Sequence, residues 1–394
     1  MLLVHIVALS GKNANEVLQW CMTTMGGDRP MTEPNIPYRR LLNHRIAGGK
    51  PGKPEQAVLR LGALQAQDYH QALWAVGLRT ADASVAAVER SIEDGKILLT
   101  WLMRGTIHMV PAEDAKWMLK LLAPRVLAQD KRRLQQLELT PEIMERGKHL
   151  VYDALRGHKR VSRTDLMHRL KEAGIRTDGQ RGYHMLWHFA QEGLICLGPK
   201  EGKQQTFALL EEWVSGAKDM PPDAGLAELA VRYYQGHGPA TVPDFAWWTG
   251  MTLADARKAV ELARSLLMVE KFGGQEYWLA SSSQADTSDE RTGVYLIPGF
   301  DEYLLGYKDR GRVLKPEHAP YIVPGGNGVF MPTVVIDGQV AGLWKRTVKK
   351  KGIDIEIRLF VPGQDREEGL IEAAGRYCAF MEQPLVSTDI RLLE

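Results

Sequence analysis

The spacing of apolar residues near the start of the chain predicts three helices followed by a hairpin. Apolar positions recur at helical spacing over 37–47 and again over 55–72, and a third helix spans 84–93. The positions that define the first two helices are Tyr38, Leu41, Leu42 and Arg45, and then Val58, Leu61, Gln65, Tyr69 and Ala72. Residues 97–111 are rich in β-branched and large apolar residues and predict a hairpin around Arg104-Gly105. This order of elements is typical of a winged helix.

The same order returns twice along the chain. The predicted helices are 141–157, 160–174 and 181–193 in the second copy and 226–238, 239–251 and 252–266 in the third, with hairpins at 194–210 and 268–280. Ser162 and Thr252 are expected to cap helices, and the turn at Thr249-Gly250 suits a helix-turn-helix. We interpret Trp247 and Trp248 as core packing of the third copy.

Beyond residue 290 the pattern changes to short apolar runs and turns. Residues 294–307 and 330–348 predict strands and turns, 353–360 alternate as a half-buried strand does, and 367–381 predict a helix. The predicted fold class is therefore α+β, with tandem winged helices and a C-terminal α+β module. The expected boundaries are an N-terminal extension at 1–36, winged helices at 37–135, 136–218 and 222–282, and the C-terminal module at 290–394. Met31 is an alternative start.

Composition excludes several classes of protein. The 394 residues are 44% hydrophobic and 25% charged, with 50 basic and 48 acidic residues, so a polybasic tail or an acidic disordered chain is excluded. Cys21, Cys196 and Cys378 are too far apart for a thiolate metal motif, and an i,i+4 histidine pair at 184 and 188 lacks further ligands. No apolar run is long enough for a membrane helix. We expect a cytoplasmic protein without metal or other cofactor.

Charge is nevertheless segregated along the chain. Residues 125–181 hold 14 Lys/Arg and 8 Asp/Glu, a local net charge of +6, and a second basic cluster lies at 345–351. Such runs are often only solvated helix faces, but in winged helices they favour phosphate contacts. The candidate DNA-binding residues are Arg104, Lys159, Arg160, Arg163, Arg181, Lys200, Lys203, Arg310, Lys345 and Arg346.

Two pairs of polar residues are candidates for chemistry. Gln65 lies on an apolar stripe, where an unpaired amide costs roughly 1–3 kcal/mol. Gln67 follows two residues later, and on a regular helix the two side chains would point in nearly opposite directions. Gln67 can face the same way as Gln65 only if the chain leaves regular helix near 64–68. Thr106 and His108 share one face of the predicted hairpin strand. The alternative interpretations are that one glutamine caps a helix and the other lies on the surface, and that His108 is a core residue with its hydrogen bonds satisfied.

These residues lie in blocks that resemble the AlkZ/YcaQ family of winged-helix DNA glycosylases. The blocks are LQAQDY (64–69), RGTIHMVPAED (104–114), GPATVPDFAWWTGMTLADAR (238–257), GFDEYLLGYKDR (299–310) and PTVVIDGQVAGLWKR (332–346). The resemblance implies tandem winged helices in a C-shaped arrangement around duplex DNA. It also implies a monofunctional glycosylase that removes N-alkylated purines, and some members unhook interstrand crosslinks. We expect the protein to be a monomer. The family's Gln-x-Gln or Gln-x-Asp motif, which handles the catalytic water, falls on Gln65 and Gln67, with Thr106 and His108 beside it.

The chemistry of an amide narrows the expected substrate. Gln67 can orient a water but cannot deprotonate it, so the leaving group must already be good. A purine alkylated at N7 or N3 is cationic and meets that condition. Asp68 and His108 are the remaining candidates for a base. We interpret Asp301 and Glu302 as a structural signature, and the alternative function is a non-catalytic winged-helix DNA-binding protein, either a regulator or a damage sensor.

Overall fold

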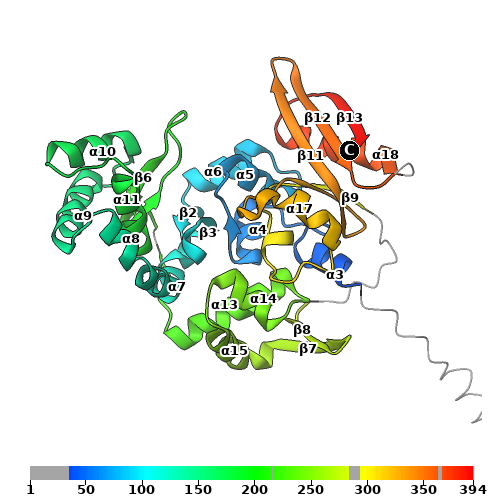
Figure 1. The fold of residues 1–394 in the computed structure, drawn as a ribbon, viewed down its shortest axis with the longest axis horizontal. Helices are drawn as coiled ribbons and strands as arrows, with labels where there is room; N and C mark the ends of the chain where they lie inside the picture. Colours follow the sequence, from blue (N-terminus) through cyan, green and yellow to red (C-terminus); the bar gives the residue numbers. More distant parts are fainter. Residues whose placement is uncertain (1–34, 215, 284–292, 363–365, 394) are drawn as a thin grey trace, which may run out of the picture. The chain divides into compact units, whose positions relative to one another are not determined.

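The computed structural model describes residues 35–214, 216–283, 293–362 and 366–393. Residues Ile36–Glu394 form one compact unit, coloured from blue to red in Figure 1. The predicted N-terminal extension, including Cys21 and Met31, lies almost wholly outside the described residues. No helix in the described ranges is long and apolar enough to cross a membrane.

The first part of this unit departs from its prediction at one place. Helices α3 (Ile36–Asn43) and α6 (Val85–Glu93) lie where expected, but the single helix over 55–72 is wrong. Helix α4 (Pro54–Leu61) ends at Gly62, whose φ of 79° suits glycine and ends the helix. The chain then forms strand β1 (Leu64–Gln65), and α5 (Tyr69–Leu78) begins after its cap, Asp68. The break therefore falls on the Gln-x-Gln segment.

The two predicted hairpins at 97–111 and 194–210 are confirmed and share one sheet. Its six strands run in the order β1-β3-β2-β5-β6-β4. They comprise β1, β2 (Ile97–Trp101), β3 (Ile107–Pro111), β4 (Val161–Ser162), β5 (Ile195–Leu197) and β6 (Thr206–Leu209), with the 3-10 turn η1 (Met103–Gly105) between β2 and β3. The hairpins join where Leu99 of β2 pairs with Leu197 of β5. Strand β1 forms one edge of this sheet.

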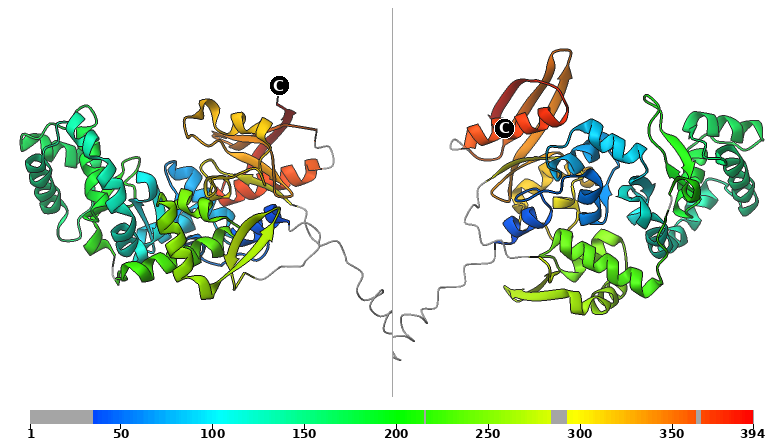
Figure 2. Two further views of the ribbon diagram at one scale, coloured as in Figure 1. Left: turned by 60° about the horizontal axis from the view of Figure 1, so that its bottom comes forward. Right: turned by 180° about the vertical axis from the view of Figure 1, so that it is seen from behind.

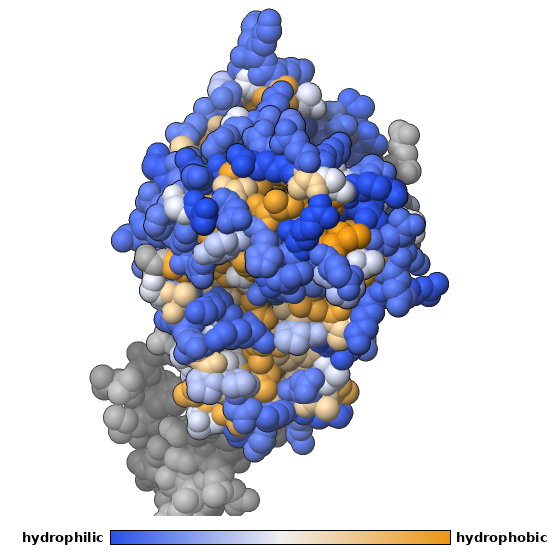
Figure 3. All heavy atoms as spheres, turned by 90° about the vertical axis from the view of Figure 1, so that its left-hand side faces the viewer, coloured by the Kyte–Doolittle hydropathy of each residue, from blue (hydrophilic) through white to orange (hydrophobic). Residues whose placement is uncertain are grey.

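Helices fill the segments between these strands. Three helices match their predictions: α9 (Pro141–Leu155), α10 (Arg163–Glu172) and α11 (Arg181–Gln191). Four elements were not predicted: the turn η2 (Ala112–Asp114), α7 (Ala115–Gln129), α8 (Lys131–Gln136) and α12 (Leu210–Trp213). Ser162 caps α10 as expected, accepting a hydrogen bond from the Asp165 N–H. The surface seen in Figure 3, on the side where Figure 1 shows α9 and α10, is mostly hydrophilic, and its apolar side chains occupy small areas.

The third set of helices and hairpin also lies where predicted. It comprises α13 (Pro222–His237), α14 (Val242–Thr249), α15 (Leu253–Leu262), the turn η3 (Arg264–Leu266) and the two-stranded sheet of β7 (Leu267–Phe272) and β8 (Gln275–Ala280). Thr241 and Asp244 form a capping box at α14, and Thr252 caps α15 as expected. Trp248 is fully buried, as predicted, but Trp247 is 41% exposed, so its assignment to the core is wrong. Its indole Nε1 donates to the Leu305 carbonyl at 3.2 Å.

The C-terminal part is a five-stranded sheet with one long helix against it. The strands run in the order β13-β12-β11-β10-β9, and α18 (Glu367–Phe380) contacts β9 and β13. Figure 2 shows this orange-red helix beside the C-terminal strands. Their bounds are β9 (Val294–Ile297), β10 (Thr333–Ile336), β11 (Gln339–Lys349), β12 (Gly352–Leu359) and β13 (Leu385–Leu392). Between β9 and β10 lie α16 (Glu302–Leu305), η4 (Pro316–His318), α17 (Ala319–Ile322) and η5 (Pro324–Gly326). Helix α16 corrects the prediction of strand and turn there, because Asp301 caps it.

Candidate active site

Strand pairing at the sheet edge brings the two predicted pairs of polar residues together. Gln65 of β1 lies directly opposite His108 of β3, and the Ala66 N–H donates to the Ile107 carbonyl at 2.7 Å. Opposite residues of an antiparallel pair project to the same face of the sheet. Beyond the strand, the amide oxygen of Gln67 accepts from the N–H of Ile107, the residue between Thr106 and His108. The departure from helix at Gly62 thus produces the arrangement that the two glutamines require.

Gln65 is held through both its backbone and its side chain. Its backbone N–H donates to Glu302 Oε1 at 2.9 Å, and its amide oxygen accepts from Arg104 Nη2 at 3.4 Å. The residue is only 8% exposed. Among the described residues its amide nitrogen has no hydrogen-bond partner, so the –NH₂ group is available to a ligand or a water.

Gln67 is exposed and held loosely. Its amide oxygen accepts from the Ile107 N–H at 3.4 Å, a long distance for a hydrogen bond. Asp68, the next residue, is committed to the fold, because its Oδ1 accepts from the N–H groups of His70 and Gln71 at 3.1 and 3.2 Å. Gln67 is therefore the more adaptable of the two glutamines, and Asp68 acts as a helix cap.

His108 is a buried, neutral imidazole. Its Nδ1 lies 2.9 Å from the Thr106 carbonyl, which can only accept, so Nδ1 carries the proton. Burial, with a contribution from the Arg104 charge, lowers the pKa of His108 to about 4. Its Nε2 is buried without a partner among the described residues, and the Thr106 hydroxyl donates to the Met103 carbonyl at 3.2 Å. A group with so low a pKa is a weak base.

Arg104 links the hairpin turn to α14. Its Nη1 donates to the carbonyls of Trp247, at 3.2 Å, and Trp248, while its Nη2 reaches Gln65. Its φ of 55° is unusual for a residue other than glycine. Burial lowers the pKa of Arg104, and the Glu302 charge opposes that shift. Its guanidinium is thus used inside the protein, although it was predicted to contact DNA.

Glu302 belongs to this site, and the sequence did not predict it there. The carboxylate is 1% exposed and accepts hydrogen bonds from the Gln65 N–H and from Trp248 Nε1, both at 2.9 Å. His237 Nε2 lies 3.7 Å from Glu302 Oε2. Burial alone would raise the pKa of Glu302, but His237, His108 and Arg104 together lower it below its usual value. The only signal in the sequence was the FDEY block, which carries no spacing relation to Gln65.

The adjacent carboxylate has a different role. Asp301 forms a bidentate ion pair with Arg79 at 2.7 and 2.9 Å, and both side chains are fully buried. Asp301 and Glu302 therefore point to different partners, Arg79 and Gln65. The structure shows no arrangement of these two carboxylates across a common sugar site, as a glycosidase of the paired-carboxylate type would need.

Half of the ten predicted DNA-binding residues are exposed on the surface. Lys159, Arg160, Arg163, Lys203 and Lys345 are exposed, and none has an ion pair among the described residues. Lys200 Nζ lies 3.8 Å from the centre of the Tyr69 ring, which follows the Gln-x-Gln segment. Burial and the charges of Lys200 and Arg346 lower the pKa of His70, so positive charge from β11 and from the β5–β6 turn gathers beside the start of α5.

Besides Arg104, two more of the predicted DNA-binding arginines are used inside the fold. Arg181 is 6% exposed and donates to the carbonyls of Leu137 and Glu138. Arg310 Nε donates to the Leu304 carbonyl at 2.7 Å, and its guanidinium lies over the Trp247 ring. Arg346 is intermediate, since it is half-buried and donates to the Tyr377 hydroxyl.

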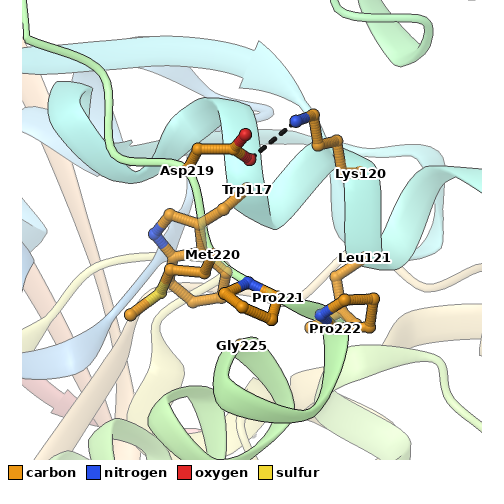
Figure 4. A pocket seen from close by; sticks show the side chains of 8 residues that line it. All are labelled: Trp117, Lys120, Leu121, Asp219, Met220, Pro221, Pro222 and Gly225. Carbon is orange, nitrogen blue, oxygen red and sulfur yellow. Dashed lines mark hydrogen bonds and ion pairs between the residues drawn. The ribbon is translucent and has the colours of Figure 1, made fainter.

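Two hollows lie near these elements. One of about 390 Å³ adjoins Arg104 and is also lined by Arg125, Gln129 and the turn at 249–251. The other, of about 600 Å³, lies between α7 and the start of α13, where Trp117 and Met220 line it and the Lys120–Asp219 ion pair lies at its edge (Figure 4). In the described part of the chain no cluster of three or more His, Cys, Asp or Glu could hold a metal ion.

Comparison with known proteins identifies the family. The model of the "DNA glycosylase AlkZ-like" family matches residues 58–380. The chain belongs to the AlkZ-like DNA glycosylase family. Its members hydrolyse N-glycosyl bonds in DNA, and this chain is an enzyme of that class.

Comparisons of sequence and of structure with AlkZ from Streptomyces sahachiroi agree with the assignment. A relative from this organism, named an interstrand DNA cross-link repair glycosylase, is 28% identical over 299 residues, which are 73% of this chain and 80% of the relative. The solved structure of the Streptomyces sahachiroi DNA glycosylase AlkZ superposes with a TM-score of 0.75 at 24% identity, covering 91% of this chain and 98% of that one. The mixed helix and sheet fold is therefore that of the AlkZ structure.

Proposed function

We propose that this glycosylase removes cationic N7- or N3-alkylated purines from double-stranded DNA, with Gln65 and Gln67 positioning the water that attacks the sugar. The observation that carries the proposal is the β1–β3 pairing, which sets Gln65 opposite His108. Gln65 is buried and its backbone is held by Glu302, while Gln67 is exposed; each amide oxygen accepts one long hydrogen bond, of 3.4 Å. One buried and one exposed amide are suited to orienting a water against a substrate.

The protonation states favour a substrate with a good leaving group. The amides cannot take a proton, Asp68 is occupied as a cap, and the pKa of His108 is about 4. Catalysis would then rest on positioning the water and on stabilising the developing sugar cation. A purine that already carries a positive charge leaves without help from a general acid.

Crosslinked DNA is the second substrate that we propose. The relative named for interstrand cross-link repair motivates it, and the exposure of Gln67 supports it, since a bulky lesion must reach the glutamines without being fully enclosed. Base flipping into a closed pocket, which many glycosylases use, would be unsuitable for such a lesion.

We further propose that residues 37–135, 136–218 and 222–282 act as three winged helices and 290–394 as the C-terminal module. Their helices and hairpins have the required order, with the first two hairpins merged into one sheet. The proposed phosphate contacts are Lys159, Arg160, Arg163, Lys200, Lys203, Lys345 and Arg346. We leave out Arg104, Arg181 and Arg310 because their guanidinium groups donate to carbonyls within the fold. A C-shaped arrangement, a monomeric state and a cytoplasmic location stay predictions.

An excision assay tests the proposed substrate and site. The protein is incubated with two duplexes, one with a single N7-methylguanine and one with an N7-linked interstrand crosslink. Abasic sites are then read as strand breaks after treatment with alkali. We expect the Gln65→Ala/Gln67→Ala variant to lose about 100-fold or more in single-turnover rate. The matched control, Gln56→Ala/Gln135→Ala, removes two exposed glutamines elsewhere and should retain the wild-type rate. Equal rates for wild type and the site variant would refute the proposal.

A further inference from the structure

The carboxylate of Glu302 is buried directly behind Gln65. It comes from α16, 237 residues further along the chain, and is 1% exposed. Its two oxygens accept from the Gln65 N–H and from Trp248 Nε1, both at 2.9 Å. The first hydrogen bond is made to the backbone of the proposed water-positioning residue, so movement of Glu302 would move Gln65.

Glu302 carries its negative charge without a direct cationic partner among the described residues. The neighbouring Arg79 is paired with Asp301, and the Arg104 guanidinium is bonded to carbonyls and to Gln65. His237, at 3.7 Å, is fully buried, and burial lowers its pKa so that it is neutral near pH 7. An ionised group in such surroundings is costly unless hydrogen bonds compensate it, and a hydrophobic contact of the same size would not incur that cost.

The charge of Glu302 bears on the proposed reaction. Arg104 places a positive charge beside Gln65, and that charge would repel both a cationic purine and the sugar cation that forms as the glycosidic bond breaks. The buried carboxylate of Glu302, which accepts from the Gln65 backbone N–H, offsets this repulsion, and its effect is large because it is 1% exposed.

We infer that Glu302 is a positioning residue for Gln65 and the electrostatic stabiliser of positive charge on the deoxyribose during base release. The inference rests on the proposed function. It requires the carboxylate to act in two separable ways, through its hydrogen bond to the Gln65 N–H and through its charge.

Binding to two abasic-site analogues separates charge from structure. One duplex carries a pyrrolidine analogue of the sugar, which is cationic near pH 7, and the other a neutral tetrahydrofuran analogue. Wild-type protein should bind the pyrrolidine duplex more tightly, and Glu302→Gln should reduce that preference about tenfold or more while leaving tetrahydrofuran binding nearly unchanged. A purely structural role would weaken binding to both duplexes equally.

Three further measurements complete the test. Glu302→Asp keeps the charge but shortens the side chain that reaches Gln65. It should therefore retain the preference for the pyrrolidine duplex and slow single-turnover excision. If Glu302→Gln does not fold, the result for Glu302→Asp alone tests the inference. The control is Glu270→Gln, which alters a half-buried carboxylate paired with Arg39. It should change neither the preference for the pyrrolidine duplex nor the rate of excision. Retention of the preference in Glu302→Gln, or its loss in Glu302→Asp, overturns the inference. Wild-type protein that releases no alkylated base would instead refute the proposed function.

Discussion

The burial of His108 predicts a measurable loss of stability in mild acid. The ring is fully buried and its pKa is about 4, against an ordinary value of 6.5. Because the folded pKa is the lower one, the unfolded chain binds more protons between these values, and stability falls as the pH decreases through this window. Between pH 7.5 and pH 5 this single residue should cost about 2 kcal/mol in the free energy of unfolding.

Denaturation in urea at the two pH values measures this cost. His108→Asn removes the titrating group and keeps a side-chain N–H that can donate to the Thr106 carbonyl. Other titrating groups, among them the buried His44 and His237, remain in both proteins and cancel in the comparison. The free energy of unfolding should therefore fall by about 2 kcal/mol less in the variant than in wild type. An identical fall in both proteins would show that His108 titrates normally, and the argument that it is neutral in the site would be refuted.

Three other predictions concern packing and DNA binding. Asp301→Asn leaves Arg79 buried without its ionised partner and should lower the free energy of unfolding by about 3–5 kcal/mol, measured by urea denaturation. Trp248→Ala, in the core, should lower the free energy of unfolding by about 3–5 kcal/mol, and Trp247→Ala, at an exposed indole, by about 1 kcal/mol. Equal decreases for the two variants would contradict the assigned burial. Lys203→Ala should weaken binding to all duplexes alike and reduce the slope of log affinity against log salt by about one, measured by fluorescence anisotropy between 50 and 200 mM salt.

Local signals were sufficient to predict most helices and hairpins. Ser162 and Thr252 begin helices as their side chains require, and the glycine pair at 273–274 turns the third hairpin. The prediction of a continuous helix over 55–72 failed because the apolar stripe outweighed two local signals, Gly62 and Asp68. Read together, a positive-φ glycine and a capping aspartate six residues apart indicate a helix end and a helix start.

The remainder of the site depends on contacts that no local pattern reveals. Glu302 meets Gln65 only because α16 packs behind β1, and a spacing of 237 residues carries no periodic signal. The commitment of Arg181 to backbone carbonyls is likewise invisible in a charge count, which treats every arginine as exposed. Sequence could therefore predict which residues have suitable chemistry but not which of them face solvent.

The distribution of charge in the structure links the site to its proposed substrate. The lysines and arginines that would hold the phosphates lie after α9, on α10, in the β5–β6 turn and on β11. Among the described residues, the charged side chains that hydrogen-bond to Gln65 are Arg104 and Glu302, which oppose one another. A site of this kind binds the anionic backbone at a distance from the reaction and keeps the surroundings of the glycosidic bond close to neutral. A strongly positive site would bind DNA more tightly but would repel a cationic purine. Because the basic residues that would bind phosphates lie apart from the nearly neutral site, one protein can hold the DNA polyanion and still stabilise a cation at the glycosidic bond.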